Sequence, residues 1–297
     1  MRICFLIWLL LSLTAPFAAQ AQGKLKVVAS FSIIGDMVTQ IAGNNVDLKI
    51  LVGANGDAHE YEPTTVDARS LANADIVFIN GLGLEGWIER LIHSSGYKGQ
   101  VIIVTKSIKT LEADAHGHVA DDPHAWQDLA NGKIYMINIR DALANADKTH
   151  SAEYTKNTAL YLKELDALDS WVKSEIAKVP ADKRTVISMH DSFQYFALRY
   201  GVKFIAPLGI STESQASAAD MARIIDQVRK QNITAVFLEN MTDSRLIRQL
   251  ESDAGAHVGG TLYSDAISAP DEPAPNYIAM FRHNVTELVA AMQNNPE

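Results

Sequence analysis

Short apolar runs alternate with amphipathic segments along this chain, and that alternation most limits the folds open to it. Runs rich in Val, Ile and Leu are typical of strands, and the segments between them carry apolar residues at helical spacing. Because several runs are apolar almost throughout, we expect parallel strands covered on both faces, which means an α/β fold. The expected strands are Leu25–Ala29, Val46–Val52, Asp75–Ile79, Val101–Val104, Thr185–Met189, Val202–Ala206, Ala235–Glu239 and His257–Leu262, and the expected helices are Ile33–Ala42, Glu85–His93, Asp191–Tyr200, Gln215–Gln231, Asp243–Ala254 and Tyr277–Met292.

One helical pattern, from Tyr154 to Val179, is much longer than the others. Its apolar residues recur three or four positions apart, and Pro180 ends it. Such a helix would be roughly 39 Å long, the size of a domain. We therefore expect two similar α/β lobes joined by one long rigid helix. The expected segments are an N-terminal lobe at 22–150, a connecting helix at 151–180 and a C-terminal lobe at 181–297.

The first 21 residues are expected to be a cleaved signal peptide. Arg2 is followed by an apolar run, Cys4–Leu13, and then by Ala19-Gln20-Ala21, which fits a small-x-small cleavage site. The run is too short to cross a bilayer, which takes about 20 residues. Cys4 precedes the run instead of standing at the cleavage site, so we do not expect a lipid anchor there. We expect export to the periplasm and a mature chain without cysteine.

The charge balance excludes some partners. The chain carries 35 acidic and 26 basic residues, for a formal net charge of −9. An acidic surface argues against nucleic acid or anionic membranes as partners. It is compatible with a cationic ligand, although charge alone does not identify one.

Four potential metal ligands stand at the ends of expected strands or in the loops after them. His59 follows the strand Val46–Val52, His124 lies in the motif Asp122-Pro123-His124, His190 ends the strand that begins at Thr185, and Asp265 follows the last strand. Open α/β sheets bind ligands at the carboxyl ends of their strands. Because each lobe supplies two of the four residues, a cleft between the lobes would collect them all.

Three imidazoles and one carboxylate suit a tetrahedral zinc ion, whereas manganese favours more oxygen ligands. The four residues are far apart in the sequence and form no local zinc motif. Their spacing alone therefore does not identify a site.

The segments around these residues resemble the periplasmic zinc- and manganese-binding receptors of metal ABC importers. The resemblance rests on Asp57–Pro63, Asp122–Trp126, His190–Tyr200 and Leu262–Ala266, in the same order and at similar spacing over nearly the whole mature chain. It implies that His59, His124, His190 and Asp265 bind the metal, that two lobes share a connecting helix, and that the protein is not an enzyme.

Further features look closest to the zinc-specific members of that family. Manganese receptors commonly carry glutamate where this chain has His190, and the stretches Gly209–Ala216 and Tyr263–Asn284 are similar to those of zinc receptors. The resemblance implies Zn(II) as the transported ligand and an importer permease with its ATPase as partners. It also implies, for some members, a periplasmic zinc chaperone. We expect a monomer, and a manganese receptor of the same family is the alternative.

Two other readings come from different classes. A zinc hydrolase would use three histidines and a carboxylate, but the chain has no His-Glu-x-x-His helix, and four protein ligands leave no position for water. A receptor for an organic solute would need more aromatic residues than these loops offer. Gly81–Gly86 is only a weak glycine fingerprint for phosphate binding.

Three secondary expectations complete the sequence analysis. His116 and His118 would form a capture site ahead of His124, or would be incidental histidines in a polar loop. Glu239, at the end of a strand, is expected to orient a ligand histidine. Metal release is expected through local loop movement, at His190–Phe193 or Asp265–Pro270, because the long helix would limit lobe motion.

Overall fold

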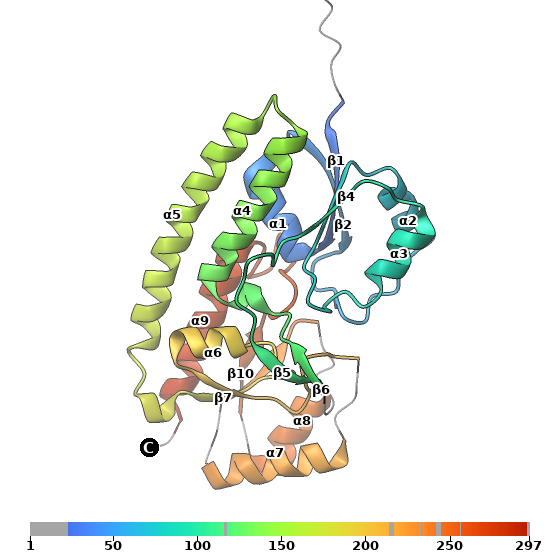
Figure 1. The fold of residues 1–297 in the computed structure, drawn as a ribbon. Helices are drawn as coiled ribbons and strands as arrows, with labels where there is room; N and C mark the ends of the chain where they lie inside the picture. Colours follow the sequence, from blue (N-terminus) through green and yellow to red (C-terminus); the bar gives the residue numbers. More distant parts are fainter. Residues whose placement is uncertain are drawn as a thin grey trace, which may run out of the picture.

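The computed structural model describes residues 23–115, 118–213, 217–231, 233, 235–241, 245–255 and 257–295. Its fold is α/β with two lobes, each built on a four-stranded parallel sheet that helices flank (Figure 1). The predicted fold class is confirmed. The expected signal peptide, residues 1–21, lies outside the described residues.

The N-terminal sheet has the strand order β2-β1-β3-β4, and every neighbouring pair is parallel. Helix α1 packs on one face of this sheet, and α2 and α3 lie on the other (Figure 1). The elements are β1 (Leu25–Phe31), α1 (Ser32–Ala42), β2 (Val46–Val52), α2 (Thr65–Ala72), β3 (Ile76–Ile79), α3 (Ile88–Ser95) and β4 (Gln100–Ile103).

The C-terminal sheet has the order β10-β9-β7-β8, again all parallel. Read from the other edge, this is the order of the first sheet, with the first strand of the lobe between its second and third. The two lobes therefore share one topology. The elements are β7 (Thr185–Ile187), α6 (Gln194–Tyr200), β8 (Lys203–Ile205), α7 (Ala218–Gln231), β9 (Ala235–Glu239), α8 (Arg245–Ala254), β10 (His257–Leu262) and α9 (Tyr277–Gln293).

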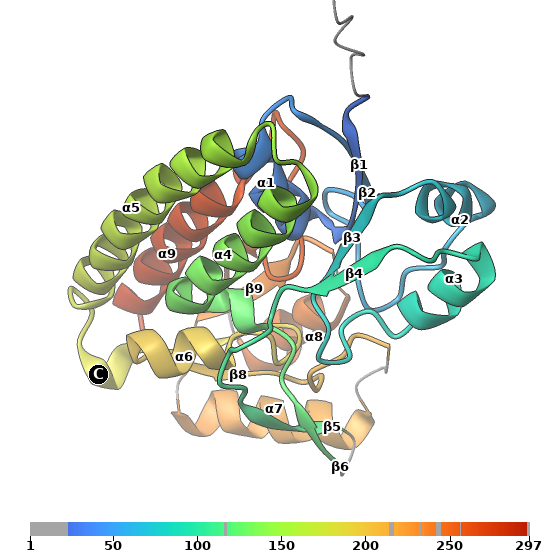
Figure 2. The same ribbon diagram turned by 45° about the horizontal axis from the view of Figure 1, so that its top comes forward.

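Two long helices, α4 (Leu129–Ala146) and α5 (Ser151–Ile176), lie between the two sheets in the sequence. Helix α5 runs along one side of the molecule beside α4 and α9 (Figure 2). It contacts α1 and α4 near the first sheet and α6 and α9 near the second. Its buried residues form one stripe, as the periodicity predicted: Tyr154, Thr158, Tyr161, Leu165, Leu168, Val172 and Ile176.

Three elements were missed by the sequence analysis: helix α2, helix α4 and an antiparallel hairpin of β5 (Glu112–Ala115) and β6 (His118–Asp121). The buried face of α4 includes Gly132 and Ala142 among larger residues, so its apolar period is weak. Gly132 is needed because a Cβ atom there would meet the Tyr277 hydroxyl of α9. The strands of the short hairpin are polar, so they lack the apolar run that identifies a strand in a sequence. Two 3-10 turns, Ala125–Gln127 and Ala181–Lys183, complete the described elements.

The core extends across both lobes. One large cluster of buried apolar residues takes in both sheets and α1, α4, α5, α6 and α9, and a smaller cluster lies between α7 and the second sheet. Over the residues that the structure describes, no helix has the length and apolar character to cross a membrane.

Candidate metal centre

The structure brings the four predicted residues together between the lobes. His59, His124, His190 and Asp265 each offer one nitrogen or oxygen atom, and these atoms lie within 4.8 Å of one another. The cluster is closed to solvent: His59 is 5% exposed and the other three are 0% exposed. No comparable cluster of His, Cys, Asp and Glu occurs elsewhere in the described part of the chain.

The distances inside the cluster fit a single ion. The Nε2 atom of His124 is 3.3 Å from that of His59 and 3.4 Å from that of His190. Asp265 Oδ2 is 3.3 Å from His59 Nε2 and 3.1 Å from His190 Nε2, and Oδ1 is 3.7 Å from His124 Nε2. Zinc–nitrogen bonds of about 2.05 Å give a tetrahedron with edges of about 3.3 Å. The measured separations are close to that edge.

Asp122 fixes the ring of His124. Its Oδ1 atom accepts hydrogen bonds from the His124 backbone N–H at 2.9 Å and from the ring Nδ1 at 2.7 Å. Both residues are fully buried. A ring that donates from Nδ1 to a carboxylate presents the lone pair of Nε2 on its opposite side. Asp122 therefore orients the His124 ring so that its Nε2 atom faces the centre of the cluster.

Glu239 does the same for His190 from the end of β9. Its Oε2 atom lies 2.6 Å from the His190 Nδ1, and its Oε1 accepts the backbone N–H groups of Met189 at 2.8 Å and His190 at 3.1 Å. The Ser264 hydroxyl adds a bond to Oε2 at 2.7 Å. Glu239 thus positions the His190 ring, as its place at a strand end predicted.

His59 lies on the irregular loop that joins β2 to α2. Asp57, two residues earlier, accepts the His59 backbone N–H through Oδ1 at 2.8 Å. The indole N–H of Trp87 donates to the Ala58 carbonyl at 2.8 Å, which fixes the loop to its own lobe. Glu60 and Glu62, the other acids of this loop, are exposed and are solvated charges.

Asp265 follows β10 and faces the three rings. Neither of its buried oxygens accepts a hydrogen bond of normal geometry. The neighbouring Ser264 carbonyl accepts hydrogen bonds from Trp126 Nε1 at 2.9 Å and Gln127 Nε2 at 2.8 Å, both from the N-terminal lobe. A buried carboxylate without such partners is costly unless a cation compensates it. The donor set therefore fits a bound cation.

The charges of the cluster act strongly on one another. Burial favours the neutral form of Asp265, but the rings of His190 and His124 outweigh it and hold its pKa well below the usual value. Burial likewise opposes protonation of His190, yet the carboxylates of Glu239 and Asp265 raise its pKa well above the usual value. A divalent cation would replace the proton that His190 otherwise holds.

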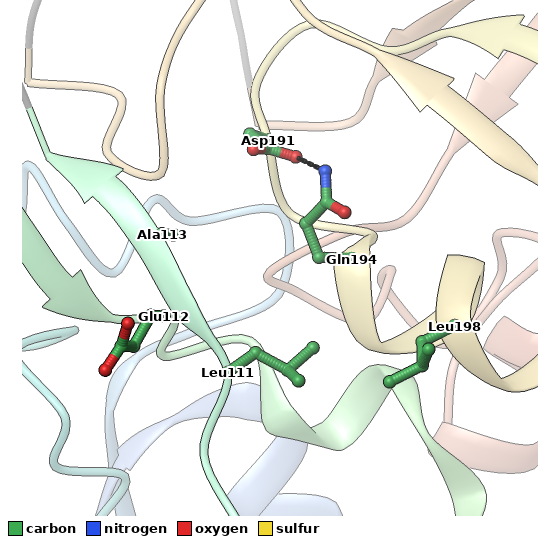
Figure 3. Close-up of a pocket in the computed structure, with 6 residues that line it drawn as sticks. All are labelled: Leu111, Glu112, Ala113, Asp191, Gln194 and Leu198. Atoms are coloured by element: carbon green, nitrogen blue, oxygen red, sulfur yellow. Dashed lines mark hydrogen bonds between the residues drawn. The ribbon is translucent and has the colours of Figure 1, made fainter.

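A cavity of about 520 Å³ opens near the cluster but none of the four residues lines it. Figure 3 shows its lining, where Gln194 Nε2 donates to Asp191 Oδ1 at 2.6 Å. Asp191 follows His190 in sequence, but its side chain lines this cavity. Of the two histidines proposed for capture, His116 lies outside the described residues and His118 is exposed on β6.

Sequence reasoning missed the roles of Asp57 and Asp122. Both stand two residues before a predicted ligand, in Asp57-Ala58-His59 and Asp122-Pro123-His124. An Asp at that spacing closes a turn onto the backbone N–H two residues later. The repeated Asp-x-His spacing was the signal that would have found them.

Comparisons with known proteins identify the family of this chain. Residues 27–291 match the family model described as "Zinc-uptake complex component A periplasmic". The manganese-binding lipoprotein MntA of Halalkalibacterium halodurans is 29% identical, over 98% of this chain and 99% of that protein.

Two solved structures are similar over most of the chain. The periplasmic zinc-binding protein TroA of Treponema pallidum superposes with a TM-score of 0.86 at 29% identity, covering 91% of this chain and 99% of that one. A Mn-bound point mutant of a periplasmic metal-binding protein from Candidatus Liberibacter asiaticus gives 0.82 at 34% identity, covering 90% and 98%. This chain belongs to the Zinc-uptake complex component A periplasmic family, the metal-binding receptors of ABC importers, and is not an enzyme.

Proposed function

We propose that the protein binds one Zn(II) ion through His59, His124, His190 and Asp265 and delivers it to an ABC importer. The observation that carries this proposal is the tetrahedral spacing of one carboxylate and three imidazoles, with separations of 3.1–3.7 Å for the measured pairs. Four protein ligands in a site closed to solvent are typical of a holding site, because a catalytic zinc keeps one position open for water.

Charge balance supports a divalent cargo. Three buried carboxylates, those of Asp122, Glu239 and Asp265, surround the three rings. With neutral imidazoles, a divalent cation brings the local charge from about −3 to about −1. Without the ion, protons on the rings would have to compensate the carboxylates.

Manganese is the second candidate cargo. It is supported by the names of relatives, among them the manganese-binding lipoprotein MntA and a Mn-bound solved structure. The donor set favours zinc, because three nitrogen ligands suit zinc better than manganese, and most sites of this kind hold zinc more tightly. Asp265 is the only carboxylate in the cluster itself.

Delivery of the metal depends on export of the receptor and on its partners. Family membership supports a permease and its ATPase as partners. We further propose that residues 1–21 are removed on export, that the receptor acts as a monomer in the periplasm, and that a zinc chaperone loads it. The mass of the purified exported protein and its size in solution test the first two points, and faster zinc loading by a periplasmic extract tests the third.

The experiment that tests the cargo is a competition titration. The mature protein is stripped of metal and titrated with zinc and with manganese against a chelator of known affinity. His190→Ala and Asp265→Ala each remove one proposed ligand, and His93→Ala serves as a matched control, because His93 is exposed on α3.

We expect one zinc ion per chain, which manganese does not displace. The zinc affinity should fall by at least a hundredfold in both ligand variants and stay unchanged in the control. Tighter binding of manganese would replace the cargo and keep the receptor role. Absence of any tight metal, or equal affinity in all variants, would contradict the proposed site.

A further inference from the structure

The least buried of the four proposed ligands is His59, at 5% exposure against 0% for the other three. It also lies on a long irregular segment, since residues 53–64 between β2 and α2 contain neither helix nor strand. A metal ion that enters or leaves a closed cluster must displace at least one side chain. The loop of His59 is therefore the most accessible route by which a metal could enter or leave the site.

The start of this loop is firmly attached to the opposite lobe. Asn55 has a left-handed backbone, with φ of 56°, and its N–H donates to the Ile267 carbonyl at 3.0 Å. Its side chain donates to Glu272 Oε2 at 2.7 Å and accepts from Asn240 Nδ2 at 2.8 Å. Three hydrogen bonds at one residue make Asn55 the fixed end of the loop.

Nearer to the metal, and outside the cluster of ligands, the described residues show one hydrogen bond between this loop and that lobe. Thr212 Oγ1 donates to Asp57 Oδ2 at 2.7 Å, while Asp57 Oδ1 holds the His59 backbone N–H. One carboxylate therefore connects the ligand loop of the N-terminal lobe to a segment of the C-terminal lobe. That segment is itself linked to the His190 loop, because Asp191 N–H donates to the Gly209 carbonyl at 3.0 Å.

The surroundings of this bond allow it to break. Asp57 and Thr212 are both half-buried, so water can replace the bond when the loop moves. The contact of Ala58 with Trp87 lies within the N-terminal lobe and does not need to change. Opening at Thr212 would free His59 while Asn55 holds the loop in place.

We propose that the hydrogen bond from Thr212 to Asp57 is a latch that keeps His59 on the bound metal and sets the rate at which the metal leaves. This inference rests on the proposed function of the cluster. It assigns Asp57 and Thr212 as positioning residues and not as metal ligands. It also places the moving part at the His59 loop, in addition to the loops after β7 and β10.

The test is the rate of zinc release. Protein loaded with Zn(II) is mixed with excess coloured chelator in a stopped-flow instrument, and the first-order release rate is measured for wild type, Thr212→Val and Thr212→Ser. The matched control is Thr155→Val, which removes a hydroxyl that bonds the Ser151 carbonyl at 2.9 Å on the exposed face of α5.

A half-exposed hydrogen bond to a carboxylate should slow release by about three- to tenfold. We expect Thr212→Val to accelerate release by that factor, Thr212→Ser to restore the wild-type rate, and Thr155→Val to have no effect. Release from Thr212→Val at the wild-type rate would overturn the latch. Failure of Thr212→Ser to restore the rate would overturn it as well.

A double-mutant cycle separates the bond from other effects of the two residues. Asp57→Ala should release zinc faster than wild type, and adding Thr212→Val should cause no further acceleration. Additive effects would overturn the latch. The proposed function is tested separately, by the competition titration of wild type and the ligand variants. If that titration supports the zinc site and the effects of Asp57→Ala and Thr212→Val are additive, the latch alone is refuted.

Discussion

The substitution Glu239→Gln tests how strongly zinc affinity depends on the orientation of the His190 ring. The donors that converge on the Glu239 carboxylate include two backbone N–H groups, the Ser264 hydroxyl and His190 Nδ1. Glutamine keeps the shape but offers one oxygen. If that oxygen still accepts the backbone N–H groups, the amide NH₂ faces His190. The His190 Nδ1 must then accept a hydrogen bond from the amide. The ring proton moves to Nε2, the atom that points into the cluster.

The size of the effect follows from this proton. Substituting a carboxylate behind a metal-bound histidine typically lowers metal affinity by about 10- to 100-fold. That range corresponds to about 1.4–2.7 kcal/mol, which agrees with about 1.5–3 kcal/mol for a hydrogen bond to a charged group. We therefore expect Glu239→Gln to bind zinc about 10- to 100-fold more weakly than wild type.

Proton release gives a second readout, which a general loss of stability would not change. Glu239 raises the pKa of His190, so zinc binding to wild type at neutral pH should release about one proton from that ring. In Glu239→Gln the proton on Nε2 can pass to Nδ1, and release should fall toward zero. Calorimetric titrations in two buffers with different ionisation enthalpies measure the number released.

The matched control is Glu85→Gln. Glu85 is similarly buried, and it accepts hydrogen bonds from the Ser30 hydroxyl at 2.6 Å and the Asn80 N–H at 2.7 Å instead of bonding any of the three rings. It should lose stability but keep its zinc affinity within about threefold. Wild-type affinity and wild-type proton release in Glu239→Gln would refute the reasoning.

Three further predictions concern the anionic ligand, the pH dependence of zinc binding and the packing of α9. Asp265→Asn removes the only anionic ligand, so zinc affinity should fall more than about a hundredfold (about 2.7 kcal/mol) in the competition titration; a smaller loss would assign the ion elsewhere. Burial opposes protonation of His190, but Glu239 and Asp265 raise its pKa, so its proton competes with the metal at neutral pH. Zinc affinity should therefore rise between about pH 6 and 8, by up to about tenfold per unit, and a flat profile would contradict this. Gly132→Ala places a Cβ 2.5 Å from the Tyr277 hydroxyl, which bonds the Trp126 carbonyl, so urea unfolding of the metal-free protein should show a loss of about 1–3 kcal/mol. An unchanged midpoint would mean that α9 adjusts freely.

The sequence predicted elements best where one physical signal dominated. All eight strands of the two sheets were predicted, because each contains Val, Ile, Leu or Phe within a short run. The α5 stripe was predicted because its apolar residues recur three or four positions apart. Helix α4 was missed because Gly132 and Ala142 dilute its period, and Gly132 is required by a contact with α9 that no local pattern contains.

The site needed more than local pattern. His59, His124, His190 and Asp265 are distant in the chain, so only the family resemblance grouped them before the fold did. Glu239 could be predicted as a partner because it ends a strand. Asp57 and Asp122 share the Asp-x-His spacing that could have marked them in the sequence, but their hydrogen bonds were shown only by the structure. The shared strand order of the lobes was likewise hidden, because strand pairing is not local.

Helix α5 has a consequence for how an importer could recognise a loaded receptor. It contacts helices of both lobes along one side of the molecule. Nearby, the Tyr277 N–H at the start of α9 donates to Asp36 Oδ2 of α1 at 2.9 Å. We expect lobes joined in this way to swing apart only slightly, so that the outlines of loaded and empty receptor would differ little. The information that a metal is present would then be displayed locally, by the position of a few loop residues at the seam between the lobes.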